Sequence, residues 1–202
     1  GAGFDILYYH SGGTIYTGGT ASTQSITLKI YQDSTKTYGT AVGADIGTDS
    51  FTSFEQYSGG NANDTIIIDN TVTNAFLGPN NYTLLFGYGG NDNITGSDNA
   101  SEYYYAMTTY DNGADTINLG GGNDTIRAGN ENSVANDSYA LGAGDDFLDL
   151  RFDAQVGGTI TLSGTGTGTI VGYGMGTDSF SGVERIISKE VTDLFLLLSL
   201  IH

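Results

Sequence analysis

The sequence contains no cysteine and no tryptophan, one proline, and only six lysines and arginines among its 202 residues. The absence of cysteine excludes disulfides and thiolate metal sites, so an extracellular form of the protein needs another stabilising element. Because 23 aspartates and glutamates outnumber the basic residues, the formal net charge is −17. This charge repels nucleic acids and anionic membranes. We therefore expect cations as partners, and no nucleic acid.

Long apolar runs and catalytic motifs are missing as well. The longest apolar stretch, 193–201, has nine residues, far fewer than the ~20 that cross a bilayer, so we expect no transmembrane segment. His10 and His202 are the only histidines, and no serine lies in a G-x-S-x-G motif. The sequence therefore lacks the histidines and the serine motif that a Ser-His-Asp triad or a histidine-zinc site requires. We expect no enzymatic activity in this chain.

Glycine is abundant instead, with 32 residues, together with 14 tyrosines and nine phenylalanines. The aromatic content argues against disorder. Short segments rich in threonine, isoleucine and valine alternate with glycine turns, which is typical of strands. The sequence predicts an all-β protein with no helix longer than two turns before Ser188.

A unit of glycine, acid and large apolar residue recurs in two interleaved series. Asp92, Asp115 and Asp137 are spaced by 23 and 22 residues, and Glu102, Asp124 and Asp146 by 22 and 22. The residue two positions after each acid is aliphatic or aromatic, giving one column of Ile94, Ile117 and Tyr139 and another of Tyr104, Ile126 and Leu148. This pattern predicts a solenoid of about 22 residues per coil, with two short strands per coil and both columns stacked inside. Arg127 should point outward, so Ile126→Asp should be far more damaging than Arg127→Asp.

Four of these units resemble the calcium-binding nonapeptide repeats of the RTX (repeats-in-toxin) family, G-G-x-G-x-D-x-U-x with U a large aliphatic residue. "GGGNDTIR" (120–127) and "LGAGDDFLD" (141–149) match closely, and "GYGGNDNIT" (87–95) and "GGNANDTII" (59–67) have one glycine replaced. The resemblance implies a parallel β-roll or β-helix that binds Ca²⁺, in a secreted or cell-surface bacterial protein. The family roll has 18 residues per coil, so we expect the additional residues in edge turns such as 105–111 and 128–134.

Stacked glycine turns with inward carbonyls, each with one carboxylate, would offer Ca²⁺ the hard oxygen ligands that it prefers. We expect Asp124 with Asp146 to form the best site, then Asp92 with Asp115. Asp115 with Asp137 ranks third and Glu102 with Asp124 last, because Ala62, Ala100 and Ala135 replace a glycine in some units. The full set of expected metal ligands is Asp64, Asp92, Glu102, Asp115, Asp124, Asp137 and Asp146, with carbonyls near Gly87, Gly90, Gly113, Gly120, Gly122, Gly142 and Gly144. Asp49 and Asp178, with Glu55 and Glu184, are candidates for further Ca²⁺ binding, but we expect the aspartates to cap turns and the glutamates to be solvated.

A longer repeat frames the roll. "GTDSFTSFEQ" (47–56) recurs as "GTDSFSGVER" (176–185), and "GAGFDIL" (1–7) as "GAGDDFL" (142–148). We expect the end of a preceding roll at 1–7, a strand segment at 8–56, the calcium roll at 57–155, a second Thr/Gly-rich strand segment at 156–188 and an apolar tail at 189–202. No second roll is recognisable after the second copy. The tail has three interpretations: a strand or helix packed on its neighbours, a C-terminal secretion signal, or an altered end of a longer protein.

The resemblance implies a calcium-binding structural region of an adhesin or surface-layer-like protein that folds on Ca²⁺ after export. The alternative is an accessory module of a secreted protease, lipase or polysaccharide-modifying enzyme. A catalytic pectate-lyase-type helix fits less well, because the acids lie in glycine turns. Candidate partners are neighbouring copies of the repeat and a cell-surface polysaccharide. Tyr103, Tyr104, Tyr105 and Tyr110 either form a sugar-stacking face or, as we favour, pack Tyr104 inside with its neighbours outside.

Overall fold

The computed structural model describes residues 6–7, 9, 22–76, 81–106, 112–128, 135–151, 158–172, 175–188 and 194–197. These residues form two β-sheets and one short 3-10 helix, Asn74–Phe76. The predicted all-β class is confirmed within this part of the chain. No helix in it is long and apolar enough to cross a membrane.

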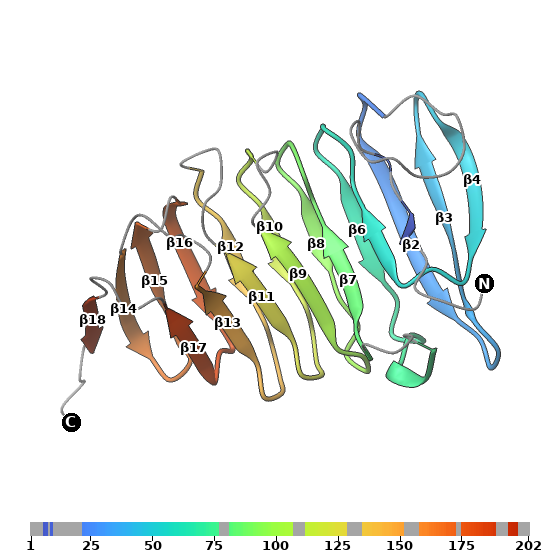
Figure 1. The fold of residues 1–202 in the computed structure, drawn as a ribbon. Helices are drawn as coiled ribbons and strands as arrows, with labels where there is room; N and C mark the ends of the chain where they lie inside the picture. Colours follow the sequence, from blue (N-terminus) through green and yellow to red (C-terminus); the bar gives the residue numbers. More distant parts are fainter. Residues whose placement is uncertain are drawn as a thin grey trace.

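The first sheet has seven strands, all parallel (Figure 1). In spatial order they are β1 (Ile6–Leu7), β5 (Gln56–Ser58), β7 (Thr83–Phe86), β9 (Glu102–Ala106), β11 (Thr125–Ala128), β13 (Phe147–Leu150) and β17 (Arg185–Ser188). The colour sequence in Figure 1 shows that the strands follow one another along the sheet in chain order.

The second sheet has eleven strands and is mixed. Its parallel centre contains β2 (Ile26–Gln32), β6 (Thr65–Ile68), β8 (Asn93–Thr95), β10 (Thr116–Asn118), β12 (Ser138–Ala140) and β16 (Met175–Ser181). At one end the sheet continues with the antiparallel strands β3 (Thr37–Gly43) and β4 (Gly47–Thr52). At the other end it continues with the antiparallel strands β15 (Thr167–Gly172) and β14 (Gly158–Gly164). There β18 (Leu194–Leu197) pairs in parallel with β14. From β5 to β13 the chain alternates strictly between the two sheets.

The two predicted apolar columns are confirmed by the strand register. Ile117 pairs with Ile94 on one side and Tyr139 on the other, and Ile126 pairs likewise with Tyr104 and Leu148. All six side chains are at most 1% exposed and belong to one core that runs from Ile26 to Val183. The short strands therefore bury one large residue each between the sheets.

Glycine is required where the turns between strands stack closely. A Cβ on Gly144 would lie 1.6 Å from the carbonyl oxygen of Gly122, and one on Gly113 equally close to that of Gly90. Gly120, Gly122 and Gly142 also have positive φ angles of 89°, 122° and 102°. Both the backbone conformation and the close approach exclude larger residues.

The longer repeat is visible in the strands. β2–β3–β4 and β14–β15–β16 are both antiparallel meanders, with Phe51 opposite Gly39 in one and Phe180 opposite Gly168 in the other. β18 pairs in parallel with β14, as β6 pairs with β2. No second roll is recognisable in the sequence after the second copy, yet the strand β18 lies at 194–197 in the position that β6 has in the first copy. This agrees with the strand interpretation of the tail. The other residues of the tail lie outside the described part of the chain. The same holds for 107–111 and 129–134 of the enlarged edge turns.

Candidate cation sites on two columns of carboxylates

Each acid of the repeat stands at the start of a strand, so the parallel register stacks the acids in two columns. The column at the eleven-stranded sheet contains Asp64, Asp92, Asp115, Asp137 and Asp178. The column at the seven-stranded sheet contains Glu102, Asp124, Asp146 and Glu184. The structure thus brings together all four expected pairs of neighbouring acids.

Hydrogen bonds join successive members of the first column. The backbone N–H of Asp92 donates to Asp115 Oδ1 at 2.8 Å, and that of Asp115 donates to Asp137 Oδ1 at 2.7 Å. Asp64 donates in the same way to Asp92 at 2.7 Å, and Asp137 to Asp178 at 2.8 Å. Each carboxylate therefore satisfies a backbone donor one strand away, which is the capping role of an aspartate in a turn.

The second column repeats this arrangement. The backbone N–H of Glu102 donates to Asp124 Oδ1 and that of Asp124 to Asp146 Oδ1, both at 2.8 Å, and Asp146 donates to Glu184 Oε2 at 2.9 Å. Asp124 and Asp146 are 1% and 0% exposed. Capping uses only one oxygen of each carboxylate, so the second oxygen decides what else the column can bind.

Five of these second oxygens are buried and have no hydrogen-bond partner within the described residues. They are Oδ2 of Asp92, Asp124, Asp146 and Asp178, and Oε2 of Glu102. Buried polar atoms in folded proteins almost always have a partner, and an ion, a proton or a water is the usual explanation where protein atoms supply none. Apart from a proton that Glu102 can share with Asp124, the described residues provide no donor for these oxygens.

The second oxygens of Asp115 and Asp137 are used by tyrosines, whereas that of Asp64 accepts from the N–H of Gly60 and Glu184 is exposed. The hydroxyl of Tyr104 donates to Asp115 Oδ2 at 2.8 Å, and that of Tyr139 donates to Asp137 Oδ2 at 2.7 Å. Asp115 with Asp137 is thus the pair with the least capacity for a cation. Asp124 with Asp146 has two second oxygens without a donor, as has Glu102 with Asp124, and Asp92 with Asp115 has one.

Glu102 and Asp124, the pair expected to be weakest, each affect the pKa of the other. Burial and then the neighbouring Asp124 carboxylate raise the pKa of Glu102 to about 9. Burial is also the main reason that the pKa of Asp124 is raised to about 7. Two buried carboxyls side by side favour a positive partner, either a shared proton or a cation.

The same electrostatics apply along the first column. Burial, then repulsion from Asp115, raises the pKa of Asp92 to about 9, and burial raises the pKa of Asp178 to about 7. Burial also raises the pKa values of Asp64 and Asp115, each to about 6. Without a cation, folding these groups in their ionised form is unfavourable at neutral pH.

The carbonyl oxygens expected as ligands are placed by the glycine turns. Gly120 O accepts a hydrogen bond from the N–H of Ala143 at 2.9 Å. The carbonyls of Gly90 and Gly122 point along the stack at the α-carbons of Gly113 and Gly144. No group of three or more acidic or histidine side chains able to hold a metal occurs in the described residues. A cation here would therefore need a mixed ligand set of carboxylates, carbonyls and water.

Sequence reasoning missed that Asp178 and Glu184 continue the columns. Both are followed two positions later by a core residue, Phe180 and Ile186, which is the spacing of the repeat. That spacing, together with the glycines of the segment 172–176 before Asp178, was the available signal. Asp49 is exposed and accepts a hydrogen bond from Tyr9 Oη at 3.3 Å.

The outer face of the seven-stranded sheet is the second candidate surface. Tyr104 lies inside, while Tyr103 and Tyr105 stack on each other outside with ring centroids 5.3 Å apart. Tyr105 also stacks on Phe86 at 5.3 Å and lies under the Arg127 guanidinium at 5.4 Å. The ring faces that a sugar would need are thus used within the protein. Tyr110 and both histidines lie outside the described residues.

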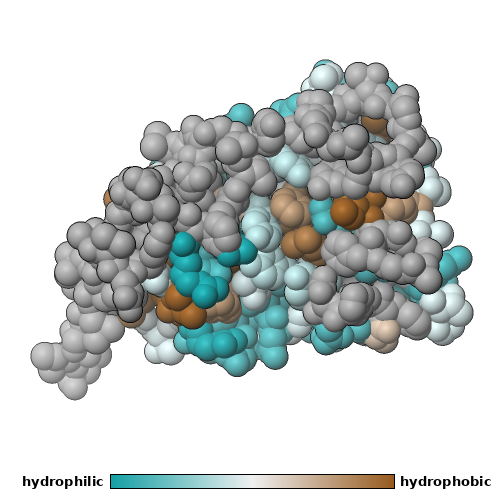
Figure 2. Space-filling view, in the orientation of Figure 1, coloured by the Kyte–Doolittle hydropathy of each residue, from teal (hydrophilic) through white to brown (hydrophobic). Residues whose placement is uncertain are grey.

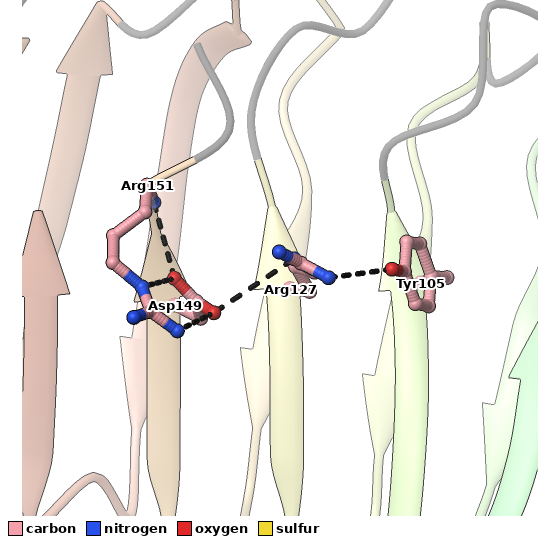
Figure 3. Close-up of polar contacts among 4 residues, drawn as sticks. All are labelled: Tyr105, Arg127, Asp149 and Arg151. Atoms are coloured by element: carbon pink, nitrogen blue, oxygen red, sulfur yellow. Dashed lines mark hydrogen bonds and ion pairs between the residues drawn. The ribbon is translucent and has the colours of Figure 1, made fainter. Parts of the chain in front are cut away.

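Arg127 is more constrained than a surface residue. Its Nη1 donates to Tyr105 Oη at 2.6 Å, and its Nε lies 3.8 Å from Asp149 Oδ2 (Figure 3). Asp149 also accepts two 2.8 Å hydrogen bonds from the Arg151 guanidinium. Arg127 alternates with the buried Ile126, as expected of an outward position. Its side chain is nevertheless only 19% exposed and links three strands, so its substitution should cost more than that of an ordinary surface residue.

No protein-family model matches the chain, and no curated protein matches it in sequence.

Proposed function

We propose that this chain is a calcium-binding structural region of a secreted or cell-surface RTX-type protein, adhesin-like or surface-layer-like, built as a parallel β-solenoid. The observation that carries the proposal is the set of five buried carboxylate oxygens without a partner. They lie in two continuous columns of a chain with a net charge of −17. A divalent cation supplies the missing positive charge.

The chemistry of the columns favours Ca²⁺ over other metals. The chain has no cysteine, and carboxylate and carbonyl oxygens are the ligands that hard cations prefer. Ca²⁺ accepts six to eight oxygens in irregular geometry, whereas Mg²⁺ requires a near-ideal octahedron. A mixed set from a pair of carboxylates, turn carbonyls and water suits the larger ion. The second oxygens of Asp124 and Asp146, which are buried and accept no hydrogen bond within the described residues, are our first candidate pair for it.

Cation binding and folding should be coupled in this architecture. Without the cation, ionised carboxylates are buried next to one another, and glycine-rich turns lose much conformational entropy on folding. Binding offsets both costs only in the folded state, so ligand concentration sets stability. A chain of this kind stays unfolded in a low-calcium cytosol and folds after export.

Thermal unfolding in calcium, magnesium and chelator tests the proposal. Extracellular modules bind Ca²⁺ at about 10⁻⁴–10⁻³ M, so the melting temperature should rise as Ca²⁺ is titrated through this range. An equal concentration of Mg²⁺ should have a much smaller effect. If chelator and Ca²⁺ give the same melting curve, the acids only cap turns and the proposal fails.

A further inference from the structure

Strand pairing in the eleven-stranded sheet aligns one outward side chain from each of ten successive strands, from β4 to β14. We call this line of side chains the hydroxyl row. In spatial order it contains Thr48, Val42, Thr27, Thr65, Asn93, Thr116, Ser138, Ser179, Thr169 and Thr161. Six are threonines, two are serines and one is an asparagine, so every position except Val42 offers a hydroxyl or an amide.

The hydroxyl row faces solvent. In the centre of the sheet its members alternate along their strands with core residues such as Ile94 and Ile117, which are at most 1% exposed. Seven of the ten members are exposed, among them Asn93, Thr116 and Ser138, and the other three are partly exposed. The row is therefore open to a ligand along its whole length.

A second row runs beside the first, two residues further along each strand. From β6 to β16 it contains Ile67, Thr95, Asn118, Ala140 and Ser181. Neither row contains a charged residue in these five neighbouring strands (Figure 1), although the whole chain has a net charge of −17. The nearest charge along the second row is Lys29 on β2. This part of the sheet is therefore an uncharged surface of hydroxyl, amide and methyl groups.

The outer side of the seven-stranded sheet is different. It carries Arg127, Asp149 and Arg185 next to aromatic rings, and Figure 2 shows strongly hydrophilic, teal surface beside apolar, brown surface. Outward strand positions in this protein thus accept charge. Strand propensity does not explain the composition of the two rows either, because asparagine is depleted in strands and yet occurs at positions 93 and 118. The uncharged composition is therefore a property of this one surface.

The two rows form a two-dimensional lattice. Neighbouring strands lie about 4.8 Å apart, and side chains two residues apart on one strand are separated by roughly 6.5–7 Å. Water molecules at the surfaces of hexagonal ice repeat over distances of the same order. The β-branched threonine side chain has few rotamers, so its hydroxyl and methyl groups stay close to their lattice positions. Such an array can order a layer of water that continues into an ice crystal, whereas a strongly hydrated charge would disturb that layer.

We propose that the outer face of the eleven-stranded sheet is an ice-binding surface, with the hydroxyl row at its centre. A crystalline polysaccharide also has a regular surface, but sugar rings stack on aromatic side chains, and neither row contains one from β6 to β16. An anionic polymer would need basic residues, which the same strands lack in both rows. The inference goes beyond cation binding, because it rests on strand register and exposure. A cation matters to it only by keeping the chain folded.

Thermal hysteresis and inhibition of ice recrystallisation test the proposal, in calcium buffer where circular dichroism shows the β fold. The wild-type chain should lower the freezing point below the melting point of ice and keep ice grains small. Thr116→Lys should lose most of both activities, because it places a charge in the middle of the hydroxyl row. The matched control is Thr125→Lys, which has the same local sequence, Asp-Thr-Ile, but points outward from the other sheet. It should act like wild type.

A second variant and the melting temperatures separate loss of ice contact from loss of fold. Ser138→Lys changes the next strand of the row and should also lose most of the activity. All three variants should melt close to wild type, because surface substitutions usually change stability by about half a kcal/mol or less.

Four results would overturn the proposal. They are a folded wild-type chain without either activity, a Thr125→Lys variant as defective as Thr116→Lys, full activity in both row variants, and retention on microcrystalline cellulose or chitin without any effect on ice. The last result would assign the surface to a polysaccharide. Failure of the calcium proposal is seen separately, in melting curves with chelator, and leaves the ice measurement interpretable in any buffer where the chain is folded.

Discussion

Shortening Ile126 to alanine removes one member of an interior column and measures how strongly the column holds the fold. Ile126 is fully buried between Tyr104 and Leu148. Large-to-small substitutions of buried aliphatic residues cost about 2–5 kcal/mol, through lost burial and the cavity left behind. For a chain of this size each kcal/mol lowers the melting temperature by about 2–4 °C. Ile126→Ala should therefore melt roughly 5–20 °C below wild type.

The control is Thr125→Ala, on the same strand but with an outward side chain. It should change stability by less than about 1 kcal/mol, the range of strand propensity. Ile126→Asp should unfold the chain, because a buried unpaired carboxylate costs several kcal/mol out of a total of about 5–15. Urea and thermal unfolding followed by circular dichroism measure all three variants. Equal shifts for Ile126→Ala and Thr125→Ala would refute the stacked interior.

Three further predictions concern the turns, the acids and the outer ion pairs. Gly144→Ala should lower the melting temperature because its methyl group would meet a neighbouring carbonyl, whereas Gly164→Ala, with nothing within 4 Å, should be neutral. In chelator, the urea midpoint should fall as pH rises from 5 to 9. Burial raises the pKa of Asp92 to about 9, so the folded state binds more protons than the unfolded chain. A midpoint that rises over this range would contradict the burial. Asp149→Ala should lower the free energy of unfolding by about 1–3 kcal/mol, because it leaves two arginines without their carboxylate. Asp145→Ala, at an exposed ion pair, should change it by no more than about half a kcal/mol. Similar losses for both would show that burial of the pair is unimportant.

The interior columns were predictable because the acids and the apolar residues recur along the sequence with the same period. A spacing of 22 or 23 residues fixes which residues pair, so Ile94, Ile117 and Ile126 could be placed without coordinates. The pairing of neighbouring acids followed from the same period. Asp178 and Glu184 escaped because long insertions separate them from Asp137 and Asp146, by 41 and 38 residues.

Contacts between side chains were not predictable, because they depend on reach across strands rather than on spacing. The Tyr104 hydroxyl extends through the interior to Asp115 of the other column, and this distinguishes the capacities of the acid pairs. Alternation with the core residue Ile126 predicts that Arg127 points outward, but it does not predict what the side chain contacts. This long side chain folds back along the sheet to Tyr105 and Asp149.

The effect of Asp124→Asn on the melting temperature, measured in chelator and in calcium at pH 8, tests the central claim most directly. Asparagine keeps the shape and the capping oxygen but removes a buried charge, whose pKa is raised by burial to about 7. Without calcium the substitution should therefore raise the melting temperature, and with saturating calcium it should lower it relative to wild type. Asp145→Asn, an exposed acid in a neighbouring turn, should show no such reversal. A shift of the same sign and size for Asp124→Asn in both buffers would contradict a cation at the carboxylate columns.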